Sequence, residues 1–316
     1  MLNVWRLQLL VQFEVLGTMQ KVADVMHVSK STVSQQLNLL EHESGVTLFE
    51  RVGRQVRLTI AGYELCRKVR PVLGQLESIG NSLGEADAKV VGTVRIAAFS
   101  SAMSSFVLPA LRRLKDPYPQ LGSTVLELEP NLSLPLLDSR QIDIAIVAYL
   151  GRGDNLQRLD RAVTPLGTDG MQILVGRDDP LAQHETIRIE DLADATWAME
   201  QDNAYLPSYM KSLCKAAGFT PKVGGIFTSY SAMQEAVRQG MMICALPTLA
   251  IASDLDDTIA VRPLAPGHIR RIFMITRNSQ RNVKTIQVAG KAIIDEAKRK
   301  LASSSNLSPV SDTKQP

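Results

Sequence analysis

The sequence GTMQKVADVMHVSKSTVSQQLNLLEHESG, residues 17–45, holds two short apolar patterns on either side of a polar turn. In the first pattern, Val22 and Met26 lie one helical turn apart. In the second, the apolar positions fall at i, i+4 and i+7: Val33, Leu37 and Leu40. A helix in a small domain buries one face and leaves the other in water, and this spacing gives that arrangement. The stretch therefore predicts two amphipathic helices joined by a tight turn.

The outer face of the second helix is uncharged and rich in side chains that both donate and accept hydrogen bonds. Ser29 is well placed as its N-cap, so Lys30 follows at the positive end of the helix. Such a helix fits the major groove of DNA, where amide and hydroxyl groups distinguish the base pairs. We therefore expect base contacts from Ser31, Thr32, Ser34, Gln35 and Asn38, and a phosphate contact from Lys30.

The same spacing also suits an ordinary helical hairpin with a solvated polar face, so the segment that follows decides between the two. Between Arg51 and Arg70 the chain has six Arg or Lys residues and one acid, Glu64. Three of the six fall on a predicted β-hairpin around Gly53, which is the geometry of a wing that contacts the phosphate backbone. We expect phosphate or minor-groove contacts from Arg51 and Arg54. An earlier helix completes a winged helix-turn-helix over residues 1–60, with Leu7, Leu10, Val11 and Val15 on its apolar face.

These residues resemble the LysR-type transcriptional regulators. The chain matches that family's pattern at Leu40-Glu41, Gly45, Leu48-Phe49, Arg51, Arg54, Leu58-Thr59 and Ala61-Gly62. It departs from the pattern at Thr18, Val22, Ser31 and Gln35, which leaves the DNA sequence preference open. The resemblance implies that double-stranded DNA is a partner, that a linker helix makes a homodimer or a homotetramer, and that a small-molecule effector binds to a C-terminal domain.

Composition narrows the class of protein further. The 316 residues are enough for more than one domain, and the net charge of +3 makes the basic wing a local feature. No run reaches the roughly 18 apolar residues of a membrane span, and no leader precedes the first helix, so we expect a soluble cytoplasmic protein. The scattered histidines and the lack of catalytic motifs predict no enzyme, no metal and no cofactor.

The three cysteines, Cys66, Cys214 and Cys244, have no CxxC spacing and suggest neither a disulfide framework nor a zinc site. Some members of the family that the chain resembles sense oxidants through thiols, so Cys214 and Cys244 form a candidate redox pair. Cys244 lies in an apolar run, however, which favours a buried core residue instead.

Residues 61–90 have a long helical pattern that begins near Thr59. Its apolar side carries Leu65, Val69, Val72, Leu73, Leu76, Ile79 and Leu83. A helix with such a continuous stripe needs a partner to cover it, and the same helix from a second copy is the simplest one. The alternative is a helix that packs only on its own domain.

From residue 91 the pattern changes to alternating strands and helices, which is typical of α/β domains with largely parallel sheets. We expect a two-lobed domain over residues 91–302 that resembles periplasmic solute-binding proteins. One lobe covers residues 91–165 and 266–302, and the other covers 166–265. Residues 303–316 are rich in Ser, Pro and Lys without an apolar period and are expected to be a disordered tail.

Ligands of open α/β sheets bind beyond the carboxyl ends of the strands. Here the strand ends carry the hydroxyls Ser100 and Ser101, and in the other lobe Gln201 and Asn203. We expect these four to orient an effector, with Tyr149, Thr228 and Tyr230 as weaker candidates for the wall of the cleft. The polar residues also suit simple helix capping. Because Glu200 and Asp202 adjoin the same loop, the charge of the effector stays open.

Two other classes of function compete with an effector-controlled regulator. The first is a DNA-binding regulator with a vestigial effector domain that responds to no ligand. The second is a solute-binding receptor, which would need neither the basic winged helix nor the cluster of Arg and Lys that follows it.

Overall fold

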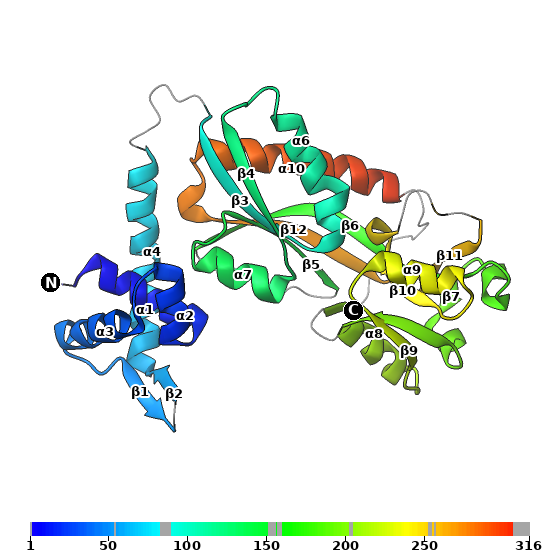
Figure 1. Ribbon diagram of the computed structural model, residues 1–316, viewed down its shortest axis with the longest axis horizontal. Helices are drawn as coiled ribbons and strands as arrows, with labels where there is room; N and C mark the ends of the chain where they lie inside the picture. The colour runs from blue at the N-terminus through cyan, green and yellow to red at the C-terminus, as the bar shows by residue number, and fades with distance from the viewer. Residues whose placement is uncertain are drawn as a thin grey trace.

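The computed structural model describes residues 2–53, 55–82, 90–150, 156, 160–201, 205–251, 255 and 257–305 (Figure 1). Arg54, Asn203 and most of the predicted tail lie outside these residues. The N-terminal part and the larger α/β part of the chain lie side by side, joined through the helix α4 (Figure 1).

The N-terminal part is a winged helix-turn-helix, as predicted. Its elements are α1 (Val4–Leu16), α2 (Met19–Met26), α3 (Lys30–Ser44), β1 (Phe49–Val52) and β2 (Gln55–Leu58). The predicted apolar positions Val22, Val33, Leu37 and Leu40 are fully buried in its core. The wing is an antiparallel hairpin in which Phe49 pairs with Leu58, and Gly53 at its turn has a φ of 64° that favours glycine.

The helix α4 (Ile60–Ser82) begins where Thr59 Oγ1 accepts a hydrogen bond from the Gly62 N–H at 3.1 Å. A Cβ atom at position 62 would lie 2.5 Å from the Leu48 carbonyl oxygen, so glycine lets this helix approach the wing closely. One side of α4 packs in the winged-helix core through Cys66, Val69 and Leu73. The other side exposes an apolar stripe: Val72, Leu76 and Ile79.

The α/β part is built on a mixed sheet with the strand order β4-β3-β5-β12-β6-β11-β7, in which β10 also pairs with β6, and on a separate two-stranded sheet of β8 and β9. The strands of the first lobe are β3 (Gly92–Ala98), β4 (Leu121–Glu127), β5 (Ile144–Leu150) and β12 (Ile269–Arg277). Those of the second lobe are β7 (Ile187–Arg188), β8 (Thr196–Glu200), β9 (Lys222–Phe227), β10 (Cys244–Pro247) and β11 (Ile259–Ala265). The strand β6 (Arg161–Gly176) belongs to both lobes.

The long strand β6 joins the lobes because its first half pairs with β12 and its second half pairs with β10 and β11. Only its second half, residues 171–175, has the uninterrupted pattern that predicts a strand from the sequence. The prediction of largely parallel sheets was also too simple: β3 is parallel to β4 and β5, and β8 to β9, but β6 is antiparallel to β10, β11 and β12.

Helices cover both faces of the sheet in each lobe. In the first lobe they are α5 (Ser100–Ala102), the π-helical η1 (Met103–Val107), α6 (Leu108–Leu114), α7 (Pro130–Asp138) and α10 (Lys284–Ser305). In the second lobe they are α8 (Tyr205–Ala216) and α9 (Tyr230–Arg238). The remaining helical elements are short 3₁₀ turns: η2 (Pro180–Gln183), η3 (Ile189–Leu192), η4 (Thr248–Ala250) and η5 (Asn278–Gln280).

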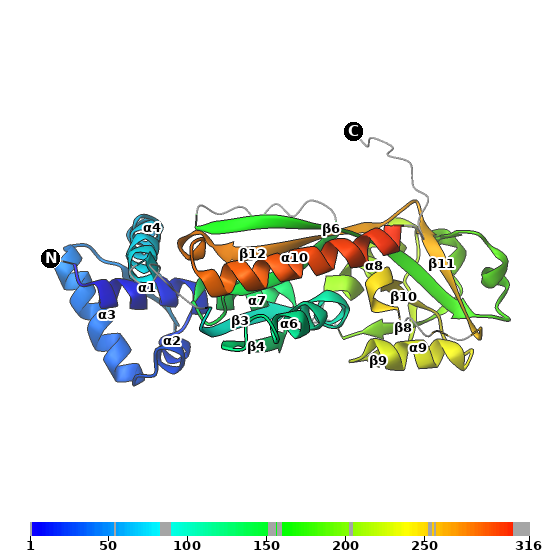
Figure 2. The same cartoon turned by 90° about the horizontal axis from the view of Figure 1, so that it is seen from above.

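These helices enclose a separate core on each face of the first lobe. The helices α6 and α10 cover one core, and α10 runs lengthwise along the sheet (Figure 2). On the opposite face Leu137 of α7 packs on β3 and β5. Since α7 also contacts α1, it lies between the sheet and the winged helix.

Candidate DNA-binding surface and effector cleft

The recognition helix α3 starts with a small hydroxyl network. Ser29 caps it, because its Oγ accepts a hydrogen bond from the Thr32 N–H at 3.0 Å. The Ser29 Oγ also lies 2.7 Å from Ser31 Oγ and 2.8 Å from Thr32 Oγ1. The network fixes the first turn of the helix and holds Ser31 at its exposed N-terminal end.

The predicted base-contacting side chains share one solvated face of α3. Lys30, Ser31, Gln35 and Asn38 are exposed, and Thr32 and Ser34 are half-buried. The adjacent Gln36 is directed elsewhere, since its Oε1 accepts a hydrogen bond from Arg6 Nε of α1 at 2.9 Å.

The wing presents cations beside this face. Arg51 is exposed on β1 and Arg57 is exposed on β2. Arg54, which follows Gly53 in the sequence, lies outside the described residues. The surface therefore joins neutral hydrogen-bonding groups on a helix with positive charge on a hairpin, which suits base edges and phosphates respectively.

A cavity of about 1230 Å³ separates the two lobes. Its wall on the first lobe includes Ser100, Ser101 and Glu129, and its wall on the second lobe includes Thr228 and Tyr230. Four of the predicted effector residues, Ser100, Ser101, Thr228 and Tyr230, are thus brought together.

Two of the other predicted effector residues do not line this cavity. Tyr149 is not among the residues that line the cavity, and it packs on the cluster around Leu137 on the opposite face of the sheet. Gln201 is exposed and also absent from the lining, and its N–H donates to the Phe227 carbonyl at 3.2 Å. Asn203 lies outside the described residues.

A buried arginine that the sequence did not single out lies at the inner end of the cleft. Arg270 of β12 is 2% exposed, and it donates to Asp169 from Nε at 2.9 Å and from Nη2 at 2.6 Å. The same Nη2 donates to Ser101 Oγ at 2.7 Å, and the guanidinium lies 4.8 Å from the centre of the Phe99 ring. Burial raises the pKa of Asp169, while the adjacent Arg270 lowers it. The Arg270–Asp169 pair thus connects β12 to β6, and the bond to Ser101 connects Arg270 to α5.

Around Arg270 lies a void of about 10 Å³, lined by Glu129, Glu200, Tyr205 and Tyr230 among others. Burial raises the pKa of Glu200 to about 7, and the nearby Glu129 raises it further, while a hydrogen bond with Tyr230 lowers it. Burial also raises the pKa of Glu129. The Tyr205 hydroxyl lies close enough to Arg270 to feel its charge, but it has no well-aligned hydrogen bond among the described residues.

The three cysteines are buried and unbridged. Burial raises the pKa of the Cys66 thiol to about 12 and that of Cys214 to about 11, and it also raises the pKa of Cys244. Cys214 of α8 packs in one core of the second lobe, whereas Cys244 of β10 packs in a different core beside α9. These surroundings disfavour the thiolate that reaction with an oxidant requires.

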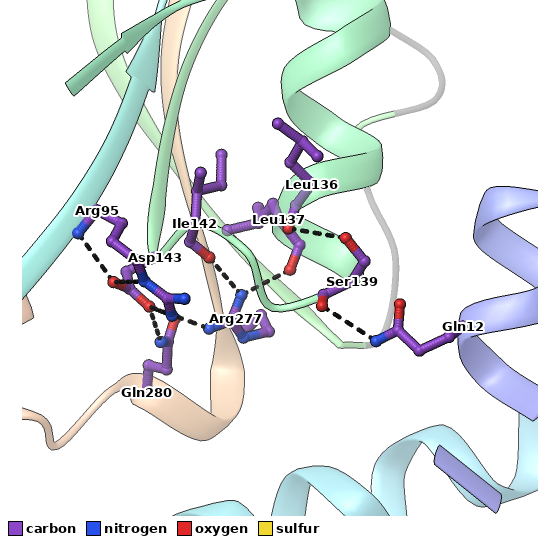
Figure 3. A network of polar contacts seen from close by, with 9 residues as sticks. All are labelled: Gln12, Arg95, Leu136, Leu137, Ser139, Ile142, Asp143, Arg277 and Gln280. Atoms are coloured by element: carbon purple, nitrogen blue, oxygen red, sulfur yellow. Dashed lines mark hydrogen bonds and ion pairs between the residues drawn. The ribbon is translucent and has the colours of Figure 1, made fainter. Parts of the chain in front are cut away.

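A polar network connects the first lobe to the winged helix (Figure 3). Gln12 of α1 is 5% exposed and donates from Nε2 to the Ser139 carbonyl at 3.0 Å. Ser139 directly follows α7. In the last turn of that helix, the Leu137 carbonyl accepts a hydrogen bond from Arg277 Nη1 at 2.6 Å. Arg277 also donates a hydrogen bond to Asp143. Burial raises the pKa of Asp143, but hydrogen bonds from Arg95 and Gln280 lower it, and the net result is a lowered pKa.

Comparison with known proteins gives the family. The family model of the bacterial regulatory helix-turn-helix protein, lysR family, matches residues 5–63, and that of the LysR substrate binding domain matches residues 87–298. The chain belongs to the LysR family. It is a DNA-binding transcriptional regulator with an effector-binding domain.

Individual relatives are distant but span nearly the whole chain. The hydrogen peroxide-inducible genes activator of Dickeya chrysanthemi is 28% identical over 281 residues, which cover 87% of this chain and 90% of that protein. The transcriptional dual regulator GltC of Bacillus subtilis is 26% identical over 273 residues, with 83% and 89% covered. The structure of a full-length OxyR variant from Pseudomonas aeruginosa has a TM-score of 0.64 at 22% identity, covering 93% of this chain and 98% of that one.

Two further features are absent from the described residues, a membrane span and a metal-binding cluster. None of the helices among the described residues is long and apolar enough to cross a membrane. Within that same part of the chain, no group of His, Cys, Asp and Glu side chains has an arrangement that would hold a metal ion.

Proposed function

We propose that this regulator reads DNA through the exposed face of α3 and the wing, and that an effector bound between the lobes controls it through α7. The base-reading residues are Ser31, Thr32, Ser34, Gln35 and Asn38, and the phosphate contacts come from Lys30, Arg51 and Arg54. The exposure of Ser31, Gln35 and Asn38 on one face of α3, together with the exposed Arg51 on the wing, supports this assignment.

The observation that carries the control mechanism is the position of α7. Glu129, which lines both the cleft cavity and its inner void, directly precedes this helix, and Ser139, which binds Gln12, directly follows it. At about 1.5 Å per residue, the nine-residue helix spans roughly 13 Å. A short, well-packed helix moves as a unit, so a ligand that displaces one end changes the contact at the other end.

We further propose that two copies pair through α4. The stripe of Val72, Leu76 and Ile79 is exposed although its spacing is that of an apolar helix face. A second copy of α4 would cover it and place two recognition helices on two half-sites. The effector would then act by changing the relative placement of those helices.

The chain's peroxide-related relatives raise a second mode of control, in which a thiol is the sensor. The burial of all three cysteines favours a bound effector over a reactive thiol. The ligand-independent regulator is the remaining alternative.

The test is a thermal-unfolding screen of the purified protein against a panel of small metabolites, because a ligand that binds the folded state raises the melting temperature. We expect a hit whose effect is lost in both Ser100→Ala and Thr228→Ala, which remove a cleft hydroxyl from each lobe. Arg51→Ala, on the wing, is the control and should keep the shift. The hit should also change the affinity for DNA selected from a random pool. If no compound does both, the ligand-independent alternative is favoured.

A further inference from the structure

The inner void of the cleft is a polar chamber built from both lobes. Glu129 comes from the turn after β4, Glu200 from the end of β8, and Tyr205 and Tyr230 from the first residues of α8 and α9. Glu129, Glu200 and Tyr230 also line the large cavity, so the chamber adjoins the cleft. A group that enters it would contact both lobes at once.

One buried atom of the chamber lacks a partner. The Oε2 atom of Glu200 is fully covered and has no hydrogen-bond partner among the described residues. The Tyr205 hydroxyl is also covered, and its contact with Arg270 is not a well-aligned hydrogen bond. Buried polar atoms are unfavourable unless they are paired. A ligand group that donates a hydrogen bond would satisfy Glu200 Oε2.

The charged residues around the chamber determine whether a cationic or an anionic ligand group is favoured there. Among the described residues around it, Arg270 is the one cation, and Asp169 already binds it through two nitrogen atoms. Glu129 and Glu200 share this one cation with Asp169, and the charge of Glu129 raises the pKa of Glu200 while Arg270 lowers the pKa of both. An incoming cation is favoured, while an incoming carboxylate or phosphate would be repelled.

The size of the chamber selects the kind of cation. A void of about 10 Å³ holds roughly one water-sized group. A primary ammonium has about that size and carries three hydrogen-bond donors, whereas a guanidinium is a larger planar group. A trimethylammonium is larger still and donates no hydrogen bond.

We infer that the effector of this regulator carries a primary ammonium group, which binds in the chamber between Glu129 and Glu200 and donates to Glu200 Oε2. This inference rests on the proposed effector control and names the chemistry of its ligand. The rest of the effector lies in the larger cavity, whose wall is rich in neutral hydroxyl and amide groups: Ser100, Ser104, Gln172, Thr228, Ser229 and Thr248. A polar, hydroxyl-bearing amine fits that wall.

The experiment compares ethanolamine with choline, since choline is the same skeleton with a trimethylated nitrogen. Binding to the full-length protein is measured by titration calorimetry and by the shift in melting temperature. We expect ethanolamine to bind and choline to bind at least about tenfold more weakly. In Glu200→Gln the affinity for ethanolamine should fall by about tenfold or more, because a charged acceptor is replaced by a neutral one.

Two more variants keep this experiment decisive. Glu129→Gln should lower the affinity for ethanolamine by a similar factor. If Glu200→Gln does not fold, Glu129→Gln is used in its place. Glu185→Gln makes the same change of charge at an exposed position of the second lobe outside the cavity, and its affinity should match that of the parent.

Three outcomes would overturn the inference: no binding of ethanolamine, equal binding of choline, or unchanged binding in both cleft variants. A neutral or anionic compound that needs Ser100 and changes DNA affinity would also overturn it, while leaving the proposed effector control in place. Failure of the control itself would look different, because then no compound bound in the cleft would alter DNA affinity.

Discussion

Glu129 and Ser139 lie at opposite ends of the same helix: Glu129 is the residue before α7 and lines the cleft, and Ser139 is the residue after it and binds the winged helix. Pro130, the first residue of α7, lines the inner void as well. The effector domain thus contacts the DNA-binding domain through an element that starts at its ligand cleft.

The first prediction concerns Gln12. Replacing Gln12 by Ala removes the hydrogen bond to Ser139 and leaves that carbonyl buried without its donor, so the free energy of unfolding should fall by about 1–2 kcal/mol. The change in DNA affinity caused by a cleft ligand should also shrink, while ligand affinity stays the same. Fluorescence anisotropy with labelled DNA measures the response. Gln20→Ala, at an exposed position of α2 away from this contact, is the matched control, and an equal loss of response there would argue against α7 as the connection.

The second prediction concerns pH. Glu200 has a folded-state pKa of about 7, above its ordinary value of 4.5, so the folded protein binds more protons than the unfolded chain between those values. Stability should therefore decrease as the pH rises from about 4.5 to about 7. Glu200→Gln removes this dependence and should be more stable than the parent above pH 8, by about 1–3 kcal/mol, with little difference near pH 4.

Urea unfolding at several pH values measures the effect. Glu185→Gln, at an exposed site, should follow the parent curve at every pH. A difference between parent and Glu200→Gln that does not change with pH would show that the pKa of this carboxyl is the same in the folded and unfolded states.

The winged helix was predictable from sequence because its determinants are local. The positions that bury Val33, Leu37 and Leu40 are set by helical periodicity, and the cap at Ser29 lies next to the helix it starts. The first half of β6 was missed for the opposite reason. Its sequence contains Pro165 and Gly167, which weaken a strand pattern, and it is held as a strand by pairing with the distant β12.

The predicted loops line a cavity between the lobes, but two of the predicted side chains, Tyr149 and Gln201, are absent from its lining. Successive residues of a strand point to opposite sides, so at the end of β5 it is Ala148, not Tyr149, that lines the void. At the end of β8 it is Glu200, not Gln201. Arg270 was missed because its partner Asp169 is 101 residues away in the chain. The sequence does contain one signal for this residue, because an arginine within an otherwise apolar strand indicates a buried charge that needs a partner.

The third prediction tests α4 as a dimer helix. Leu76 is 44% exposed on the apolar stripe, so Leu76→Glu leaves the monomer fold intact but places a charge in the proposed interface. The variant should sediment as a lighter species and lose affinity for two-half-site DNA. Arg67→Glu, an exposed position on another side of α4, should sediment like the parent. An unchanged mass for Leu76→Glu would rule out this stripe as the interface.

The fourth prediction separates base reading from phosphate binding. Gln35→Ala should lower the affinity for the selected DNA by about 1–3 kcal/mol and relax the preference at one position. Arg51→Ala should weaken binding to all sequences alike and reduce the slope of log affinity against log salt by about one. Competition of selected against random DNA at several salt concentrations measures both. If Gln35→Ala binds every sequence as the parent does, this face of α3 does not read bases.

The last prediction concerns hydrogen peroxide, the signal in the names of several relatives. A thiol reacts with peroxide as its thiolate, and burial raises the pKa of Cys214 to about 11 and that of Cys66 to about 12, so little thiolate forms near pH 7. We expect the folded protein to resist thiol alkylation until it is unfolded in urea. DNA affinity should be the same before and after peroxide treatment, in the parent and in a variant with all three cysteines replaced by alanine. A peroxide-dependent change in the parent that disappears in the cysteine-free variant would assign control to a thiol and remove the need for a cleft ligand.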